Sequence, residues 1–100
     1  MRRLQLSDMQ KDMLRAYSGH RPHGVTKGML ARARRHPEML HQPGYTYVTA
    51  AVEMLDAGYF TEPDWKARTW SVLSLRDDTP AELTEFGEQE RERLDREDWR

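Results

Sequence analysis

The sequence contains no cysteine, and this absence excludes disulfide bonds, thiolate zinc sites and cysteine nucleophiles. Long apolar runs are missing as well. No run approaches the roughly 18 residues that a membrane-spanning helix needs, and the opening MRRLQLSDMQ lacks the apolar centre of a signal peptide. We therefore expect a cytoplasmic protein with no membrane partner.

Large apolar side chains are few. The 100 residues include six Met, three Trp, four Tyr and two Phe, whereas 33% of the residues are charged. A chain of this length buries only about two thirds of the surface that its unfolded form exposes. We therefore expect one small core in a single domain spanning residues 1–100, with a charged C-terminal helical tail from about residue 88.

An excess of charge of one sign is also missing, since the net charge is −1. The charges are nevertheless unevenly distributed, with nine Lys or Arg against three acids through His41, and seven against fourteen from Gln42 onward. This asymmetry can indicate a basic contact surface or an acidic interaction tail. It can equally mean that the two halves attract each other.

Helical patterns fill the first half of the chain. Ser7, followed three residues later by Gln10, predicts a capping box at the start of a first helix. Thr26 predicts the cap of a second helix, which Pro37 ends near His36.

A third helix has the clearest pattern. It begins at Thr46, where a threonine can act as the cap, and Gly58 supplies the left-handed residue that ends helices. The apolar positions follow the i, i+3, i+4, i+7 spacing of one buried face: Val48, Ala51, Val52 and Leu55. In the connector before this helix, Met39 and Leu40 are expected to fill the core.

Two strands and a last helix are expected after the third helix. The segments YFT and RTWSVLSL, separated by the polar EPDWKA, predict a β-hairpin. The stretch TPAELTEFGEQERERLDRE predicts a closing helix that begins either at Pro80 or at Thr84.

This order of elements is that of a winged helix-turn-helix domain. Over about residues 46–94 the sequence resembles MarR-type and PadR-type transcriptional regulators, in which a Leu-x-x-Gly-aromatic turn ends the third helix and a Leu-Thr-x-x-Gly segment starts the last. The matching positions are Leu55, Gly58 and Tyr59, then Leu83, Thr84 and Gly87. The resemblance implies a mainly α fold with a small β-hairpin, consisting of three helices, a two-stranded wing and a C-terminal helix.

The resemblance also implies a function. In those regulators the third helix lies in the major groove of DNA and the wing grips the backbone. We therefore expect a small transcriptional regulator that binds duplex DNA through the third helix, the wing and the basic second helix. The candidate DNA-binding residues are Lys27, Arg32, Arg34, Arg35, Tyr45, Thr46, Thr49, Lys66 and Arg68.

The third helix itself is poorly charged for this role. No Lys or Arg lies between Gly44 and Gly58, although cations supply the phosphate contacts that dominate affinity for DNA. Glu53 and Asp56 would be repelled by phosphates, although a glutamate can accept a hydrogen bond from cytosine. Tyr45, together with the nearby Tyr47, can equally well pack in the core.

An uncharged third helix edged by acids also fits a protein-protein interaction module, such as an adaptor or inhibitor of phage or mobile-element type that does not bind DNA. The candidate partner-binding residues are then Glu53, Trp65 and Trp99, because exposed tryptophans are enriched at interface hot spots. A homodimer is a further alternative.

Enzymatic chemistry has little support in the sequence. His20 and His23 flank a proline, but no carboxylate or thiolate completes a recognisable metal-binding spacing with them. No phosphate-binding glycine loop and no nucleophile elbow is present. We expect no catalysis, no metal and no cofactor.

Overall fold

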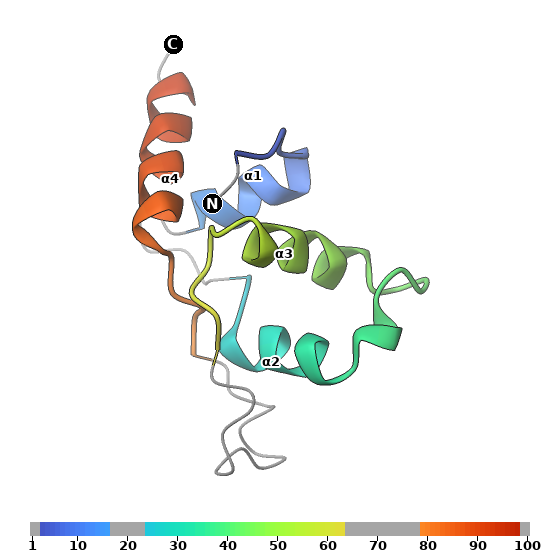
Figure 1. Ribbon diagram of the computed structural model, residues 1–100. Helices are drawn as coiled ribbons and strands as arrows, with labels where there is room; N and C mark the ends of the chain where they lie inside the picture. Colours follow the sequence, from blue (N-terminus) through green and yellow to red (C-terminus); the bar gives the residue numbers. More distant parts are fainter. Residues whose placement is uncertain (1–2, 17–23, 64–78, 99–100) are drawn as a thin grey trace.

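The computed structural model describes residues 3–16, 24–63 and 79–98, which form a mainly helical structure (Figure 1). Its elements are α1 (Asp8–Arg15), α2 (Lys27–Arg35), the short 3-10 helix η1 (Pro37–Met39), α3 (Thr46–Asp56) and α4 (Glu85–Asp98). α3 packs against both α1 and α2, and α1 also packs against α4. Among the described helices, none has the length and apolar character needed to cross a membrane.

The predicted starts of the first two helices are confirmed. Ser7 Oγ accepts a hydrogen bond from Gln10 N at 3.2 Å, and Gln10 Oε1 accepts one from Ser7 N at 3.0 Å, which completes the capping box. At the start of α2, Thr26 Oγ1 accepts from Met29 N at 3.1 Å. α2 ends one residue before His36, as the following proline predicts.

The core is built from one face of each helix and from the segment after α3. Its buried residues are Met13, Leu14, Val25, Leu30, Ala51, Met54, Leu55, Ala57, Tyr59, Phe60, Ala81 and Leu94. α3 contributes most because it lies between α1 and α2. At its C-terminal end, Gly58 has a φ of 92°, which confirms the predicted glycine turn. The cap predicted at Thr46 is wrong, because Thr46 is already helical and Tyr45 occupies the cap position without a side-chain hydrogen bond.

The predicted two-stranded wing is wrong for the described part of the chain, which contains no strand and no sheet. Phe60 forms only an isolated bridge with Leu83. The strand-like pattern of YFT has another cause, since Tyr59 and Phe60 are 0% and 2% exposed and fill the core. The remainder of the expected hairpin, residues 64–78, lies outside the described residues.

Residues 79–84 form backbone hydrogen bonds both with the start of α2 and with the segment that follows α3. Thr61 N donates to Glu82 O at 2.7 Å, and Lys27 N donates to Thr79 O at 2.9 Å. The segment therefore lies between the start of α2 and the chain that leaves α3. A second isolated bridge joins Thr26 to Pro80.

The last helix begins after Thr84, so the second of the two predicted starts is confirmed and the start at Pro80 is wrong. Gly87 N donates to Thr84 Oγ1 at 3.0 Å, and the Thr84 hydroxyl donates to the carbonyl of Gly58. Gly87 is buried, and a Cβ at this position would overlap with the carbonyl oxygen of Tyr59. The Leu-Thr-x-x-Gly pattern thus caps α4 and joins it to the end of α3.

Candidate functional site

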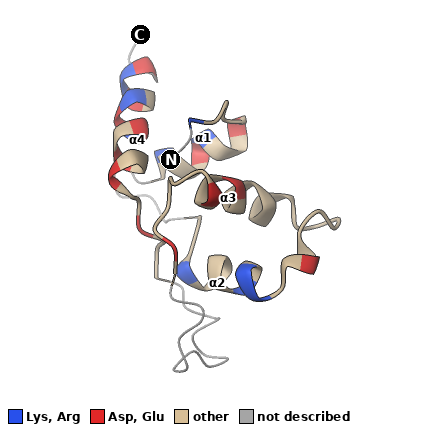
Figure 2. Cartoon of the chain, viewed as in Figure 1, with Lys and Arg blue, Asp and Glu red and all other residues tan. Residues whose placement is uncertain are grey.

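α2 ends and α3 begins at the same end of the molecule, where η1 connects them (Figure 1). We call residues 32–49 the α2–α3 corner. It carries three Arg and two His against one Glu. The first half of α3 has neither Lys or Arg nor Asp or Glu, and the acids of α3 lie in its second half (Figure 2). The corner therefore differs in charge from α4, where acids outnumber arginines.

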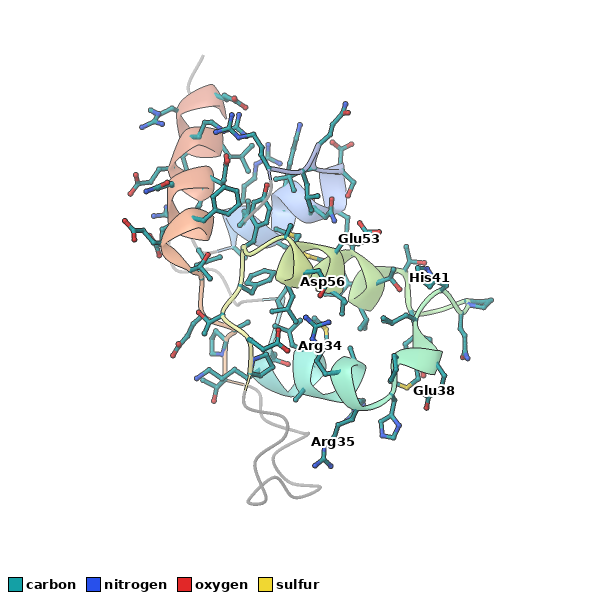
Figure 3. All side chains as sticks on the ribbon, in the orientation of Figure 1. Arg34, Arg35, Glu38, His41, Glu53 and Asp56 are labelled. Carbon is teal, nitrogen blue, oxygen red and sulfur yellow. The ribbon has the colours of Figure 1, made fainter. Side chains whose placement is uncertain are left out.

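Arg34, a predicted DNA contact, is engaged in ion pairs within the protein instead. Its Nη2 lies 2.6 Å from Asp56 Oδ1, and its Nε lies 2.8 Å from Glu62 Oε1. Nη2 also donates to Glu62 Oε2 at 2.9 Å, which makes the contact with Glu62 bidentate. The hydrogen bonds to Glu62 and Asp56 raise the pKa of Arg34 above its ordinary value, against the opposing effect of burial. Figure 3 shows Arg34 facing Asp56 between α2 and α3.

The other predicted cations of α2 are distributed along the helix. Lys27, at the end far from the corner, lies 3.3 Å from Glu82. Arg32 and Arg35 are both exposed, and Arg35 points away from α3 (Figure 3). The predicted contacts Lys66 and Arg68 lie outside the described residues. The structure therefore does not bring the predicted cations together on one face of α3.

The exposed face of α3 begins with uncharged groups and ends with acids. Thr46 is exposed and Thr49 is partly exposed, and Thr49 Oγ1 accepts a hydrogen bond from His41 N at 3.3 Å. Glu53 and Asp56 follow on the same face and are exposed. A ligand that meets the N-terminal half of α3 therefore meets hydroxyl and methyl groups before it meets a carboxylate.

The two tyrosines at the start of α3 have different environments. Tyr47 packs against the core, and burial raises the pKa of its hydroxyl. It leaves no room for a side chain at Gly24, where a Cβ would overlap with the Tyr47 hydroxyl oxygen. Tyr45 is partly exposed and does not belong to the core cluster. Both are partly exposed, but only Tyr47 is packed against the core.

Some apolar side chains of the corner do not reach the core. The prediction that Met39 and Leu40 fill the core is wrong, because both are partly exposed and lie outside the buried cluster and the described side chains packed against it. The prediction that Val48 lies on the buried face of the third helix is also wrong, because Val48, like Tyr45, is partly exposed outside the core. These side chains leave apolar surface beside the uncharged start of α3.

Sequence reasoning missed a polar contact between α1 and α3. The Gln10 side chain, which is 4% exposed, donates from Nε2 to Ala50 O at 3.1 Å and to Glu53 Oε2 at 3.2 Å. The capping pattern accounted for the Gln10 side-chain oxygen, which accepts from Ser7 N, and no sequence pattern indicated the role of its nitrogen. The contact occupies one carboxylate oxygen of Glu53, a predicted partner-binding residue.

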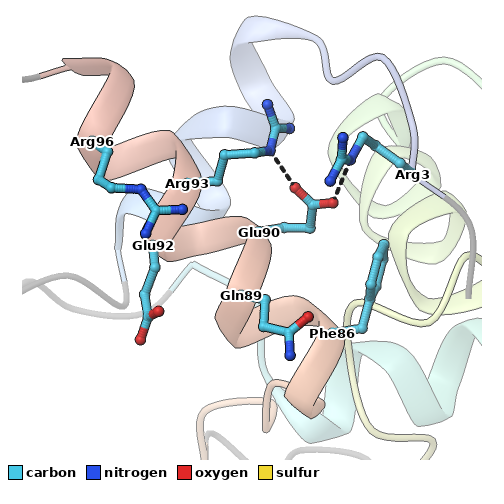
Figure 4. Close-up of a pocket in the computed structure, with 7 residues that line it drawn as sticks. All are labelled: Arg3, Phe86, Gln89, Glu90, Glu92, Arg93 and Arg96. Carbon is cyan, nitrogen blue, oxygen red and sulfur yellow. Dashed lines mark hydrogen bonds and ion pairs between the residues drawn. The ribbon is translucent and has the colours of Figure 1, made fainter.

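A pocket of about 370 Å³ lies at the other end of the molecule, between α4 and the N-terminal segment (Figure 4). Glu90 is 3% exposed at its side chain and is held at 2.6 Å by both Arg3 and Arg93. Burial alone would raise the pKa of this carboxyl, but the two arginine hydrogen bonds outweigh burial and lower the pKa. Three arginines and two glutamates line the pocket, and two of these arginines, Arg3 and Arg93, are engaged by Glu90.

Trp65 and Trp99, the two tryptophans proposed as partner contacts, lie outside the described residues. Comparisons with protein families, with characterised proteins and with solved structures found no match to this chain. The candidate site must therefore be judged on its own chemistry.

Proposed function

We propose that the protein binds duplex DNA through the α2–α3 corner and acts as a small regulator of transcription. The observation that carries this proposal is the distribution of charge. Two exposed arginines, Arg32 and Arg35, border a helix start without charged side chains. Phosphates favour such a surface, because cations on its border can neutralise them while the helix approaches a groove.

The acids of α3 are less of an obstacle than their number suggests. Asp56 lies 2.6 Å from Arg34, which also pairs with Glu62, and Glu53 accepts a hydrogen bond from Gln10 Nε2. Both acids lie in the second half of α3, whereas recognition helices contact base edges mainly through their N-terminal residues. DNA that approaches the N-terminal end of α3 would meet Thr46 and Thr49 before Glu53 and Asp56.

The number of phosphate contacts should be small. Arg32 and Arg35 are the two exposed arginines of α2. Two phosphate contacts correspond to a slope of about −2 when the logarithm of the binding constant is plotted against the logarithm of the salt concentration. Affinity for random DNA is then weak at physiological salt.

Fluorescence anisotropy with a labelled random duplex across a salt series tests the proposal. Arg32→Ala should reduce the slope by about one, because one phosphate contact is lost. Arg96→Ala removes the same charge from the exposed surface of α4 and serves as the matched control, which should leave the slope unchanged. No binding at low salt, or equal slopes for the two variants, would refute DNA binding through the corner.

A second function is favoured by the exposed apolar side chains of the corner. Met39, Leu40, Tyr45 and Val48 are partly exposed outside the core, and interface centres are poor in charge and rich in Met and aromatic residues. The simplest occupant is a second copy of the chain. Sedimentation equilibrium should then show a dimer that Leu40→Ser weakens, whereas Met9→Ser, at an exposed methionine of α1, leaves it intact. A monomer at all concentrations would refute self-association.

A further inference from the structure

The exposed start of α3 limits which bases a DNA-bound corner could read. Arg and Lys read guanine by paired hydrogen bonds, and Asn and Gln read adenine in the same way. α3 contains none of these four residue types. Of the two amides near α3, that of Gln10 is buried and donates to Ala50 O and Glu53 Oε2, and that of Gln42 donates from Nε2 to Glu38 O at 2.8 Å. Neither purine has a suitable bidentate partner on α3.

The groups that remain are methyls and an aromatic ring. Thr46 is exposed and carries a methyl beside its hydroxyl. Thr49 is partly exposed and carries a methyl beside its hydroxyl, whose oxygen accepts from His41 N. Tyr45 adds a partly exposed ring at the cap position. Such groups make apolar contacts with the one methyl in the major groove, which belongs to thymine.

We infer that the α2–α3 corner recognises the thymine C5-methyl group through Thr46, Thr49 and Tyr45, and that it prefers A·T-rich duplexes for this reason. The inference rests on the proposed function, because it specifies what the same surface would read. Arg32 and Arg35 would supply affinity for phosphates without sequence information, and the three side chains at the start of α3 would supply the preference.

Removing the C5-methyl group from thymine, or adding one to cytosine, tests this inference directly. An alternating A·T duplex should bind more tightly than the same duplex with uracil in place of thymine, by about fourfold for each methyl contacted, as expected for burial of one methyl-sized group at ~0.8 kcal/mol. In a G·C duplex, 5-methylcytosine in place of cytosine should strengthen binding, because it restores a methyl at the same groove position. Anisotropy at fixed low salt measures all four affinities.

Protein variants complete the experiment. Thr46→Ser and Thr49→Ser remove one methyl each and retain the hydroxyl, so both should reduce the difference between thymine and uracil duplexes. Thr61→Ser, at an exposed threonine outside α3, is the matched control and should retain the full difference. Equal affinity for thymine and uracil duplexes would overturn the inference and leave the proposed function standing. Absence of binding to every duplex would overturn both.

A preference for cytosine would also overturn the inference, because Glu53 is exposed on this face and its carboxylate can accept from the cytosine amino group. That outcome is recognised by tighter binding to G·C than to A·T duplexes, with no gain from 5-methylcytosine. Glu53→Gln should then abolish the preference. Under the methyl model, Glu53→Gln leaves the difference between thymine and uracil duplexes unchanged.

Discussion

Replacing Arg34 with alanine should reduce the stability of the protein far more than its affinity for DNA. The guanidinium makes one hydrogen bond to Asp56 and two to Glu62. The side chains of Arg34, Asp56 and Glu62 are 23%, 56% and 49% exposed. Because both carboxylates are half exposed, each pair is expected to contribute about 0.5–1 kcal/mol rather than the larger value of a buried pair.

The two pairs together give an expected loss of about 1–2 kcal/mol for Arg34→Ala, which corresponds to a decrease in Tm of roughly 5–15 °C in a domain of this size. Circular dichroism during thermal unfolding measures this loss. High salt should reduce the difference between wild type and variant, since the pairs are partly open to solvent. Arg32→Ala, which removes an exposed arginine of the same helix, should change stability by less than about 0.5 kcal/mol.

A double-mutant cycle with Asp56→Ala separates the pair from other effects of truncation. If the ion pair stabilises the fold as described, the losses for Arg34→Ala and Asp56→Ala should not add, and the coupling should be about 0.5 kcal/mol or more. The reasoning fails if Arg34→Ala leaves Tm unchanged and instead reduces the salt dependence of DNA binding as Arg32→Ala does. Arg34 would then be a phosphate contact, as the sequence alone predicted.

Two further predictions concern the junction of α4 with the rest of the protein. Gly87→Ala should destabilise the fold by about 3 kcal/mol or more, because the added Cβ would overlap with the Tyr59 carbonyl. Gly44→Ala is the control: φ is 89° and a Cβ would contact nothing within 4 Å, so it should cost only about 1–2 kcal/mol of backbone strain. Urea unfolding that ranks the two variants equally would contradict the close approach at Gly87. Glu90→Gln should destabilise by about 1–2 kcal/mol through weakened bonds from Arg3. Folding lowers the pKa of Glu90. The contribution of the ionised Glu90 to the free energy of unfolding is therefore fully present above the unfolded pKa of about 4.3 and is lost as pH falls through the lower folded value. Stability curves of wild type and Glu90→Gln that stay parallel from pH 7 to pH 3 would contradict this.

Local signals in the sequence predicted the helices well. The Ser7 and Gln10 pair, the Thr26 cap and the Gly58 turn all depend on hydrogen bonds or backbone angles within a few residues. Because these hydrogen bonds and angles form between residues close in sequence, they determine where a helix begins or ends without contacts from distant segments. This is why the bounds of α2 agree with prediction, and why only the cap of α3 was placed one residue too late.

Contacts between distant segments could not be predicted from spacing. Tyr59 and Phe60 have the β-branched and aromatic neighbourhood of a strand, yet they are large because they fill the core. Likewise Arg34 has the charge of a DNA contact, but its partners lie 22 and 28 residues away. A sequence pattern records the type of a side chain, whereas its role depends on which element folds against it.

The pattern behind the resemblance to winged-helix regulators is explained by the junction of α3 and α4 alone. Thr84 donates to the Gly58 carbonyl and accepts from Gly87 N, and Gly87 is required where the chain passes the Tyr59 carbonyl. These contacts fix the path from α3 through residues 59–61 to α4, and none of them depends on what the exposed face of α3 contacts. The same residues would be selected in a DNA-binding protein and in a protein-binding module. Evidence on function must therefore come from the α2–α3 corner, where Arg32 and Thr46 can be changed without disturbing that junction.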